Sequence, residues 1–143
     1  MTYADSSFLV SLYVQDSNTE RAKKYLSRNQ SPLLLTIFSK SETQHALRTL
    51  AFRKLITIGE MTQGLIHLER AQEEGVYELQ PGVPDEIFQK ATQLSHRHAL
   101  EIGVRYLDTL HIASALLVNA KRFLTFDARQ GKLAKAVGLE VRP

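Results

Sequence analysis

Four acidic side chains occupy positions from which they could share one ligand. Asp5 and Asp127 each follow a short apolar run that is typical of a strand, whereas Glu42 and Asp108 fall in the early turns of predicted helices. In a parallel sheet, the carboxyl ends of the strands and the helices that begin there meet at one edge. We therefore expect the four carboxylates to converge at that edge.

Carboxylates that converge repel one another unless a cation neutralises them. Oxygen ligands favour Mg²⁺ or Mn²⁺, and the chain has no cysteine and no paired-histidine motif that would favour another metal. Such an ion lowers the pKa of a bound water and stabilises charge on a phosphoryl oxygen. The pattern therefore predicts hydrolysis of a phosphodiester.

Each acid also has a purely structural explanation, and taken singly that explanation is the better one. Asp5 could cap the helix that follows it, and Asp108 could favour the positive end of its helix dipole. Glu42 and Asp127 each fit a capping box. Four such acids at one edge are harder to explain in this way, and a cap does not require the apolar residues that flank Asp108.

The helix that carries Asp108 is predicted over residues 105–117. Apolar side chains cover most of its circumference, and a helix that is apolar nearly all round is buried. A carboxylate is rarely buried unless it is paired or holds a metal. Because Asp108 conflicts with the apolar pattern around it, this helix is the strongest candidate for a functional element.

The remaining elements alternate between strand and helix. We expect strands at 2–4, 33–36, 76–79, 122–125 and 139–141, and further helices at 6–14, 19–27, 37–53, 57–75, 85–99 and 127–137. This alternation predicts a small parallel sheet with helices on both faces. Asp5 and Asp127 would be neighbours if the first and fourth strands flank the point where the strand order reverses.

Length and composition are those of an ordinary soluble domain. The chain has 143 residues, a formal net charge of +3 and a pI near 9.3, which suits an acidic partner such as nucleic acid but does not require one. No apolar run is long enough to span a bilayer, and the N-terminus lacks the features of a signal peptide. We expect a single domain over 1–143 and a cytoplasmic location.

Four segments together resemble the PIN-domain family. They are Ala4-Asp5-Ser6-Ser7, Ser41-Glu42, Leu107-Asp108 with the helix that follows, and Leu124-Thr125-Phe126-Asp127-Ala128-Arg129-Gln130. Their order and spacing and the total length are similar to those of the VapC toxins of toxin–antitoxin pairs. The resemblance implies a three-layer α/β/α sandwich with a small, mostly parallel central sheet.

The same resemblance implies an activity, a metal and partners. It implies an endoribonuclease dependent on Mg²⁺ or Mn²⁺, in which Asp5, Glu42, Asp108 and Asp127 bind or orient the metal. Thr125 matches the hydroxyl position that forms a hydrogen bond within the site. The resembled toxins dimerise, and a cognate antitoxin occupies their active-site groove, so we expect both for this chain.

Three basic residues lie close to these acids in sequence. Lys40, Arg105 and Arg129 could contact RNA phosphates, or they could equally pair with the acids or point into solvent. His111 lies one turn after Asp108 and could line the site, although a hydrogen-bonded helix histidine is the more common arrangement.

Two other functional classes remain open at this stage. The first is a Mg²⁺-dependent phosphatase or phosphotransfer protein, although the chain offers no clear lysine after a late strand for that chemistry. The second is a non-catalytic RNA- or protein-binding module on the same fold. Substitution of Asp5 or Asp108 by asparagine separates these classes, because only a metal nuclease loses RNA cleavage.

Overall fold

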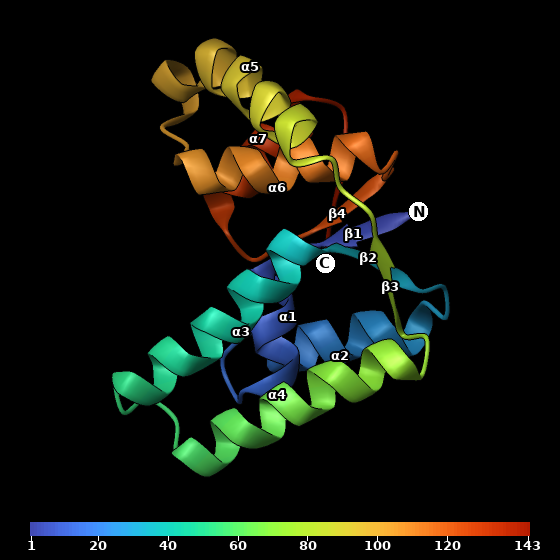
Figure 1. Cartoon of the computed structure of the whole chain (residues 1–143), viewed down its shortest axis with the longest axis vertical. Coiled ribbons are helices and arrows are strands. Elements are labelled where there is room, and N and C mark those ends of the chain that lie inside the picture. Colours follow the sequence, from blue (N-terminus) through green and yellow to red (C-terminus); the bar gives the residue numbers. More distant parts are fainter.

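A five-stranded parallel sheet forms the centre of the molecule (Figure 1). The structure is a computed structural model that describes residues 1–143. The strands are β1 (Thr2–Ala4), β2 (Leu33–Thr36), β3 (Tyr77–Gln80), β4 (Arg122–Leu124) and β5 (Glu140–Arg142). Every neighbouring pair runs parallel, so the sheet is wholly rather than mostly parallel.

The strand order is β3-β2-β1-β4-β5, and it reverses between β1 and β4. These two strands pair directly, with Ala4 opposite Leu124. The backbone N–H of Asp5 continues the pairing by donating to the carbonyl of Leu124 over 3.1 Å. The predicted neighbourhood of the first and fourth strands is therefore confirmed, and the residues that follow them lie at the reversal point, where α/β proteins bind ligands.

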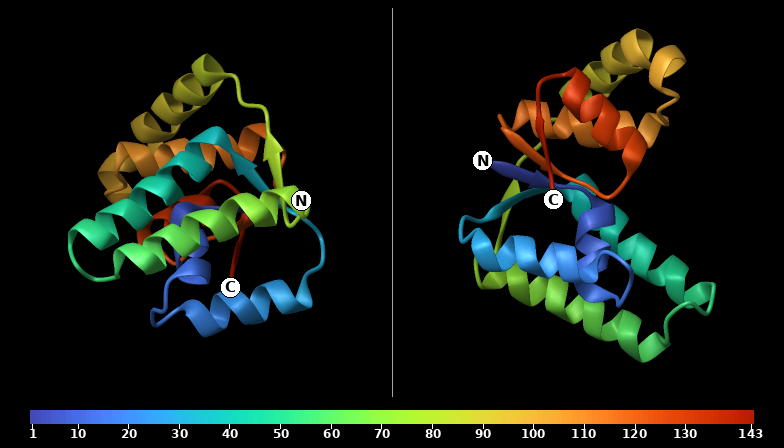
Figure 2. Two further views of the ribbon diagram at one scale, coloured as in Figure 1. Left: turned by 60° about the horizontal axis from the view of Figure 1, so that its bottom comes forward. Right: turned by 180° about the vertical axis from the view of Figure 1, so that it is seen from behind.

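Seven helices cover the two faces of the sheet. They are α1 (Ser6–Tyr13), α2 (Thr19–Arg28), α3 (Ile37–Phe52), α4 (Ile58–Glu73), α5 (Pro84–Ile102), α6 (Tyr106–Leu117) and α7 (Ala128–Ala136). Figures 1 and 2 show α1–α4 on one side of the sheet and α5–α7 on the other. The molecule is therefore the predicted three-layer α/β/α sandwich.

Side-chain alternation along the strands builds a separate core on each face. Tyr3 and Phe123 point toward α5–α7 and stack with ring centroids 5.7 Å apart. Ala4 and Leu124 point the other way, into the core formed with α1, α2 and α4. Both faces are buried, which is why the short strands read as continuous apolar runs.

Helix ends account for the main boundary difference from the sequence prediction. Helix α5 runs on to Ile102, beyond the expected end near residue 99, and stops at Gly103. Gly103 has φ +71°, a left-handed conformation that glycine adopts without a steric cost. The connection to α6 is consequently short, and α5 and α6 pack closely together. No helix of the structure has the length and apolarity needed to cross a bilayer.

Candidate active site

Asp5 is the most deeply buried acid of the site. It is fully shielded from solvent and accepts the backbone N–H of Phe8 over 2.9 Å, which caps helix α1. Its carboxylate also accepts the hydroxyls of Ser7, over 2.8 Å, and of Thr125, over 2.6 Å. Burial raises the pKa of Asp5 despite the opposing charge of His111 and these hydrogen bonds. A cation beside this carboxylate would favour its charged form.

Thr125 joins the two acids that follow β1 and β4. Its hydroxyl donates to Asp5 and accepts the backbone N–H of Asp127 over 2.9 Å. Asp127 in turn caps helix α7 by accepting the N–H groups of Arg129, over 2.7 Å, and Gln130, over 3.0 Å. These cap contacts use only one oxygen of Asp127, so the other remains free for a ligand.

Glu42 is held over the site by two other elements. Its Oε2 accepts the hydroxyl of Ser6 at the start of α1 and contacts Nε2 of His111 on α6 over 2.5 Å. Burial opposes ionisation of Glu42, but the hydrogen bond and charge of His111 and the bond from Ser6 outweigh it. The pKa of Glu42 is therefore lowered and the group is ionised at neutral pH.

A hydrogen bond to a buried side chain holds His111 in place. It is fully buried, and its Nδ1 lies 3.3 Å from the hydroxyl of Tyr3, which lies 3.3 Å from Oγ1 of Thr36. Burial is the main reason that the pKa of Tyr3 rises to about 12, so its hydroxyl stays protonated. The contacts run from the buried Thr36 through two further buried groups, Tyr3 and His111, to Glu42, which leaves Glu42 little freedom to move.

Asp108 has a structural role that the sequence anticipated. Its Oδ2 accepts the backbone N–H of Arg105 over 2.8 Å, which caps the start of α6. Its other oxygen has no hydrogen-bond partner in the protein and is accessible to solvent. Asp108 therefore caps a buried helix and still presents one free oxygen.

The predicted convergence of the four carboxylates is only partly realised. Thr125 links the Asp5 carboxylate to the backbone N–H of Asp127, and Ser6 links Glu42 to the start of α1, but no group of three or more metal-ligating side chains is assembled. Each carboxylate instead accepts a hydrogen bond from a donor of its own.

The donor set nevertheless fits a hard divalent cation. Glu42, Asp108 and Asp127 each keep one oxygen without a protein donor, and all the ligands on offer are oxygen atoms. Such an ion would bring these free oxygens together and satisfy them.

The three predicted basic residues fall into two groups. The ammonium of Lys40 contacts Glu69 over 2.6 Å and Gln72 over 2.7 Å, both on α4, so the structure does not bring it to the acids. Arg105 and Arg129 form no salt bridge and flank Asp108 and Asp127 respectively. They remain free cations at the edge of the site.

The sequence prediction did not assign roles to Ser6 and Ser7. Ser6 binds Glu42, while Ser7 binds Asp5 and accepts the backbone N–H of Phe126 over 2.9 Å. The sequence indicated a role for these serines only through their position directly after Asp5. Hydroxyl groups one and two residues from an acid lie close to it in any fold. The link from Glu42 to His111 spans 69 residues and had no local signal.

Comparison with known proteins agrees with this arrangement. The model of the PIN domain matches residues 2–136. The chain belongs to the PIN-domain family. No curated protein sequence matches it, so the further comparisons rest on structure.

Solved structures with the same PIN fold cover the whole chain. VapC20 of Mycobacterium tuberculosis, a toxin that cleaves the sarcin–ricin loop, superposes with a TM-score of 0.73 at 18% identity, with 100% of both chains covered. FitAcB of Neisseria gonorrhoeae gives 0.63 at 16% identity, covering 100% of this chain and 97% of the other. PAE2754 of Pyrobaculum aerophilum gives 0.61 at 17% identity, covering 98% and 87%. At these identities the likeness shows the fold alone.

Proposed function

We propose that residues 1–143 act as one PIN-domain nuclease, an endoribonuclease that hydrolyses RNA phosphodiester bonds with a divalent cation. The observation that carries the proposal is the linked set of acids at the reversal of strand order. There Thr125 joins Asp5 to Asp127, and His111 presents an ionised Glu42. Connected acids at the carboxyl ends of parallel strands suit metal-dependent hydrolysis.

The protein side of the mechanism follows from the contacts. Asp5, Glu42, Asp108 and Asp127 would hold Mg²⁺ or Mn²⁺, which supplies a nucleophilic water at neutral pH and stabilises charge on the phosphate. Thr125 and Ser7 keep the buried Asp5 carboxylate oriented. His111 positions Glu42 without reaching solvent itself. Each acid is thus supported by a group whose own position is set by packing.

The RNA would enter beside the two free arginines. Arg105 lies three residues before Asp108, Arg129 lies two residues after Asp127, and neither arginine forms an ion pair within the chain. A guanidinium can bind two oxygens of a phosphate at once. We assign both arginines to the phosphates of the RNA strand. Lys40 is not given that role, because its ammonium already contacts Glu69 and Gln72 on α4.

We extend the proposal to the biological setting. The likeness in fold to VapC20, a toxin that cleaves the sarcin–ricin loop, supports a toxin of a type II toxin–antitoxin pair. The partners would be a cognate antitoxin and a second copy of the chain, and the location would be the cytoplasm. Mass measurement of the chain, purified by itself and with the product of a neighbouring gene, tests both partners.

Cleavage of total cellular RNA tests the activity. Purified protein is incubated with RNA and Mg²⁺, with RNA and EDTA, and as Asp108→Asn. Asparagine keeps an oxygen that can accept the N–H of Arg105, so this substitution removes the charge while preserving the helix cap. We expect EDTA and Asp108→Asn each to abolish most cleavage. Cleavage that is unaffected by both EDTA and Asp108→Asn would rule out a metal nuclease. A non-catalytic binding module would then be the better description.

A further inference from the structure

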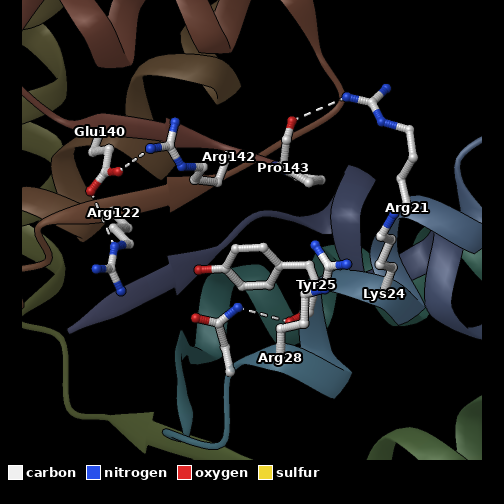
Figure 3. Close-up of a pocket in the computed structure, with 9 residues that line it drawn as sticks. Arg21, Lys24, Tyr25, Arg28, Arg122, Glu140, Arg142 and Pro143 are labelled. Atoms are coloured by element: carbon white, nitrogen blue, oxygen red, sulfur yellow. Dashed lines mark hydrogen bonds and ion pairs between the residues drawn. The ribbon is translucent and has the colours of Figure 1, made fainter.

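A strongly basic cleft is lined by none of the four acids of the candidate site. It has a volume of about 450 Å³ and lies between α2 and two neighbouring strands, β4 and the edge strand β5. Figure 3 shows its charged side chains, which are Arg21, Lys24, Arg28, Arg122, Arg142 and Glu140. Five basic side chains therefore face one acidic side chain, and the cleft attracts an anion.

Exposed side chains of β4 and β5, namely Arg122, Glu140 and Arg142, form one wall of the cleft. Arg122 pairs in register with Glu140, and Leu124 with Arg142, so side chains at alternate positions of β5 point to the cleft. The exposed Glu140 and Arg142 replace the apolar residues that a covered strand would carry. Helix α2 then forms the opposite wall (Figure 3).

The one acid is already occupied by two of the cations. Glu140 contacts Nε of Arg122 over 3.1 Å and a terminal nitrogen of Arg142 over 2.5 Å. Lys24 and Arg28 are exposed and make no ion pair, and Arg21 donates only to the backbone oxygen of Pro143. The α2 wall of the cleft is therefore left with uncompensated positive charge.

The spacing of these α2 cations fits an extended polyanion better than a single ion. Arg21, Lys24 and Arg28 stand at positions i, i+3 and i+7, which places them along one face of the helix. Seven residues at 1.5 Å each give a row about 10 Å long. A row of this length can contact successive phosphates of a nucleic-acid strand.

The cleft is physically continuous with the acid site. The guanidinium of Arg21 lies over the ring of Phe126, 5.3 Å from its centroid. The backbone N–H of Phe126 donates to Ser7, which in turn binds Asp5. A strand that leaves the acid site past the loop of Phe126 would therefore reach Arg21 first.

We propose that this cleft binds the sugar–phosphate backbone of the RNA strand beyond the cleaved bond. The choice of RNA rests on the proposed nuclease function. An acidic protein is the other polyanion that the charge allows, but a protein interface is depleted of charged residues at its centre, and six of the nine residues that line this cleft are charged. The half-buried Tyr25, held edge-on to Phe8 with centroids 6.0 Å apart, adds one aromatic surface on which a base can stack.

An RNA-binding assay tests the cleft without requiring cleavage. Binding of a 20-nucleotide single-stranded RNA is measured in EDTA by fluorescence anisotropy at a series of salt concentrations. We expect Lys24→Ala with Arg28→Ala to weaken binding about tenfold or more at low salt and to lower the salt slope by about 0.7 per lost phosphate contact. Lys24→Arg with Arg28→Lys, which retains both charges, should bind nearly as the wild type does.

The matched control is Lys23→Ala with Lys135→Ala, which removes the same charge from exposed positions outside the cleft. We expect this control to change binding less than about twofold, because only a diffuse field is reduced. An equal loss in both double variants, or no loss in the cleft variant, would overturn the proposal. Polyglutamate that binds the wild type while RNA does not would assign the cleft to an acidic protein instead.

The two proposals fail separately in this design. A protein that binds RNA through the cleft but cleaves no RNA with Mg²⁺ refutes the nuclease and leaves the cleft standing. A protein that cleaves RNA, with affinity unaffected by the cleft variant, refutes the cleft and leaves the nuclease standing. Thermal melting of each double variant verifies that it is folded.

Discussion

At the scale of single residues, the proposed site depends on the groups that orient its acids as well as on the acids themselves. Glu42 is half-buried, and its lowered pKa depends on His111 and Ser6, with burial acting against them. Asp5 is fully buried and depends on Thr125 and Ser7 for its donors. Changes to these supporting groups should therefore alter activity without removing any carboxylate.

His111→Leu is expected to reduce RNA cleavage by about 10–100-fold, the usual cost of losing a group that orients a metal ligand. Leucine cannot donate to Glu42, whose pKa should then rise, and a higher Mg²⁺ concentration should be needed for half-maximal cleavage. His111→Gln retains a side-chain donor and should keep more of the activity. Full activity in His111→Leu at unchanged Mg²⁺ dependence would show that Glu42 needs no such support.

Thr125→Val is expected to destabilise the fold by about 1–3 kcal/mol and to lower cleavage. It removes the donor to the buried Asp5 and the acceptor of the Asp127 N–H, and buried groups that lose partners carry this cost. Thr125→Ser keeps the hydroxyl and should resemble the wild type in both respects. Urea unfolding measured alongside RNA cleavage distinguishes the two variants, and equal values for both would contradict the assigned role.

At the scale of elements, side-chain contacts attach helices to the sheet at points far apart in sequence. The hydroxyls of Tyr13 on α1 and Tyr77 on β3 lie 2.5 Å apart. Burial raises the pKa of Tyr77 to about 12 and that of Tyr13 still further, so both stay neutral where free tyrosine ionises. The pair therefore makes the attachment of α1 to β3 sensitive to alkali.

Stability should fall as the pH rises from about 10 to about 12. Because the folded-state pKa is raised, the stability from the neutral pair is complete below the unfolded value near 10 and is lost as pH approaches the folded value. Tyr13→Phe with Tyr77→Phe should melt with a shallower pH dependence across this range. An identical slope in both proteins would mean that other groups control alkaline unfolding.

At the scale of the whole molecule, folding and metal binding should be separable. Both apolar cores are built from side chains of the sheet and helices and include none of the four acids. We therefore expect the chain to fold without a cation, unlike small domains whose core is a metal site. Binding of a cation should add stability to a structure that already exists.

Mg²⁺ or Mn²⁺ is expected to raise the melting temperature of the wild type, and EDTA should leave the chain folded. A ligand at one hundred times its Kd stabilises the folded state by about 2.7 kcal/mol. Asp108→Asn, which can keep the helix cap, should show a smaller shift because one anionic ligand is lost. No shift in the wild type at millimolar Mg²⁺ or Mn²⁺ would contradict the metal site independently of any activity assay.

Much of the architecture was determined by the local sequence. Short apolar runs bounded by loops, helical spacing of apolar residues and cap patterns predicted five strands and seven helices, since these signals act between residues a few positions apart. The position of Asp5 and Asp127 after strands followed from the same patterns. The family resemblance was confirmed by the PIN-domain match over residues 2–136.

Only the tertiary structure decided how the acids are held and where charge collects. Glu42 contacts His111 across 69 residues, and Lys40 contacts Glu69 on α4. The basic cleft likewise joins α2 to strands more than ninety positions later. The physical reason is that hydrogen bonds and charge interactions depend on the distance between groups in space. A sequence pattern indicates such distances only within one helix or strand.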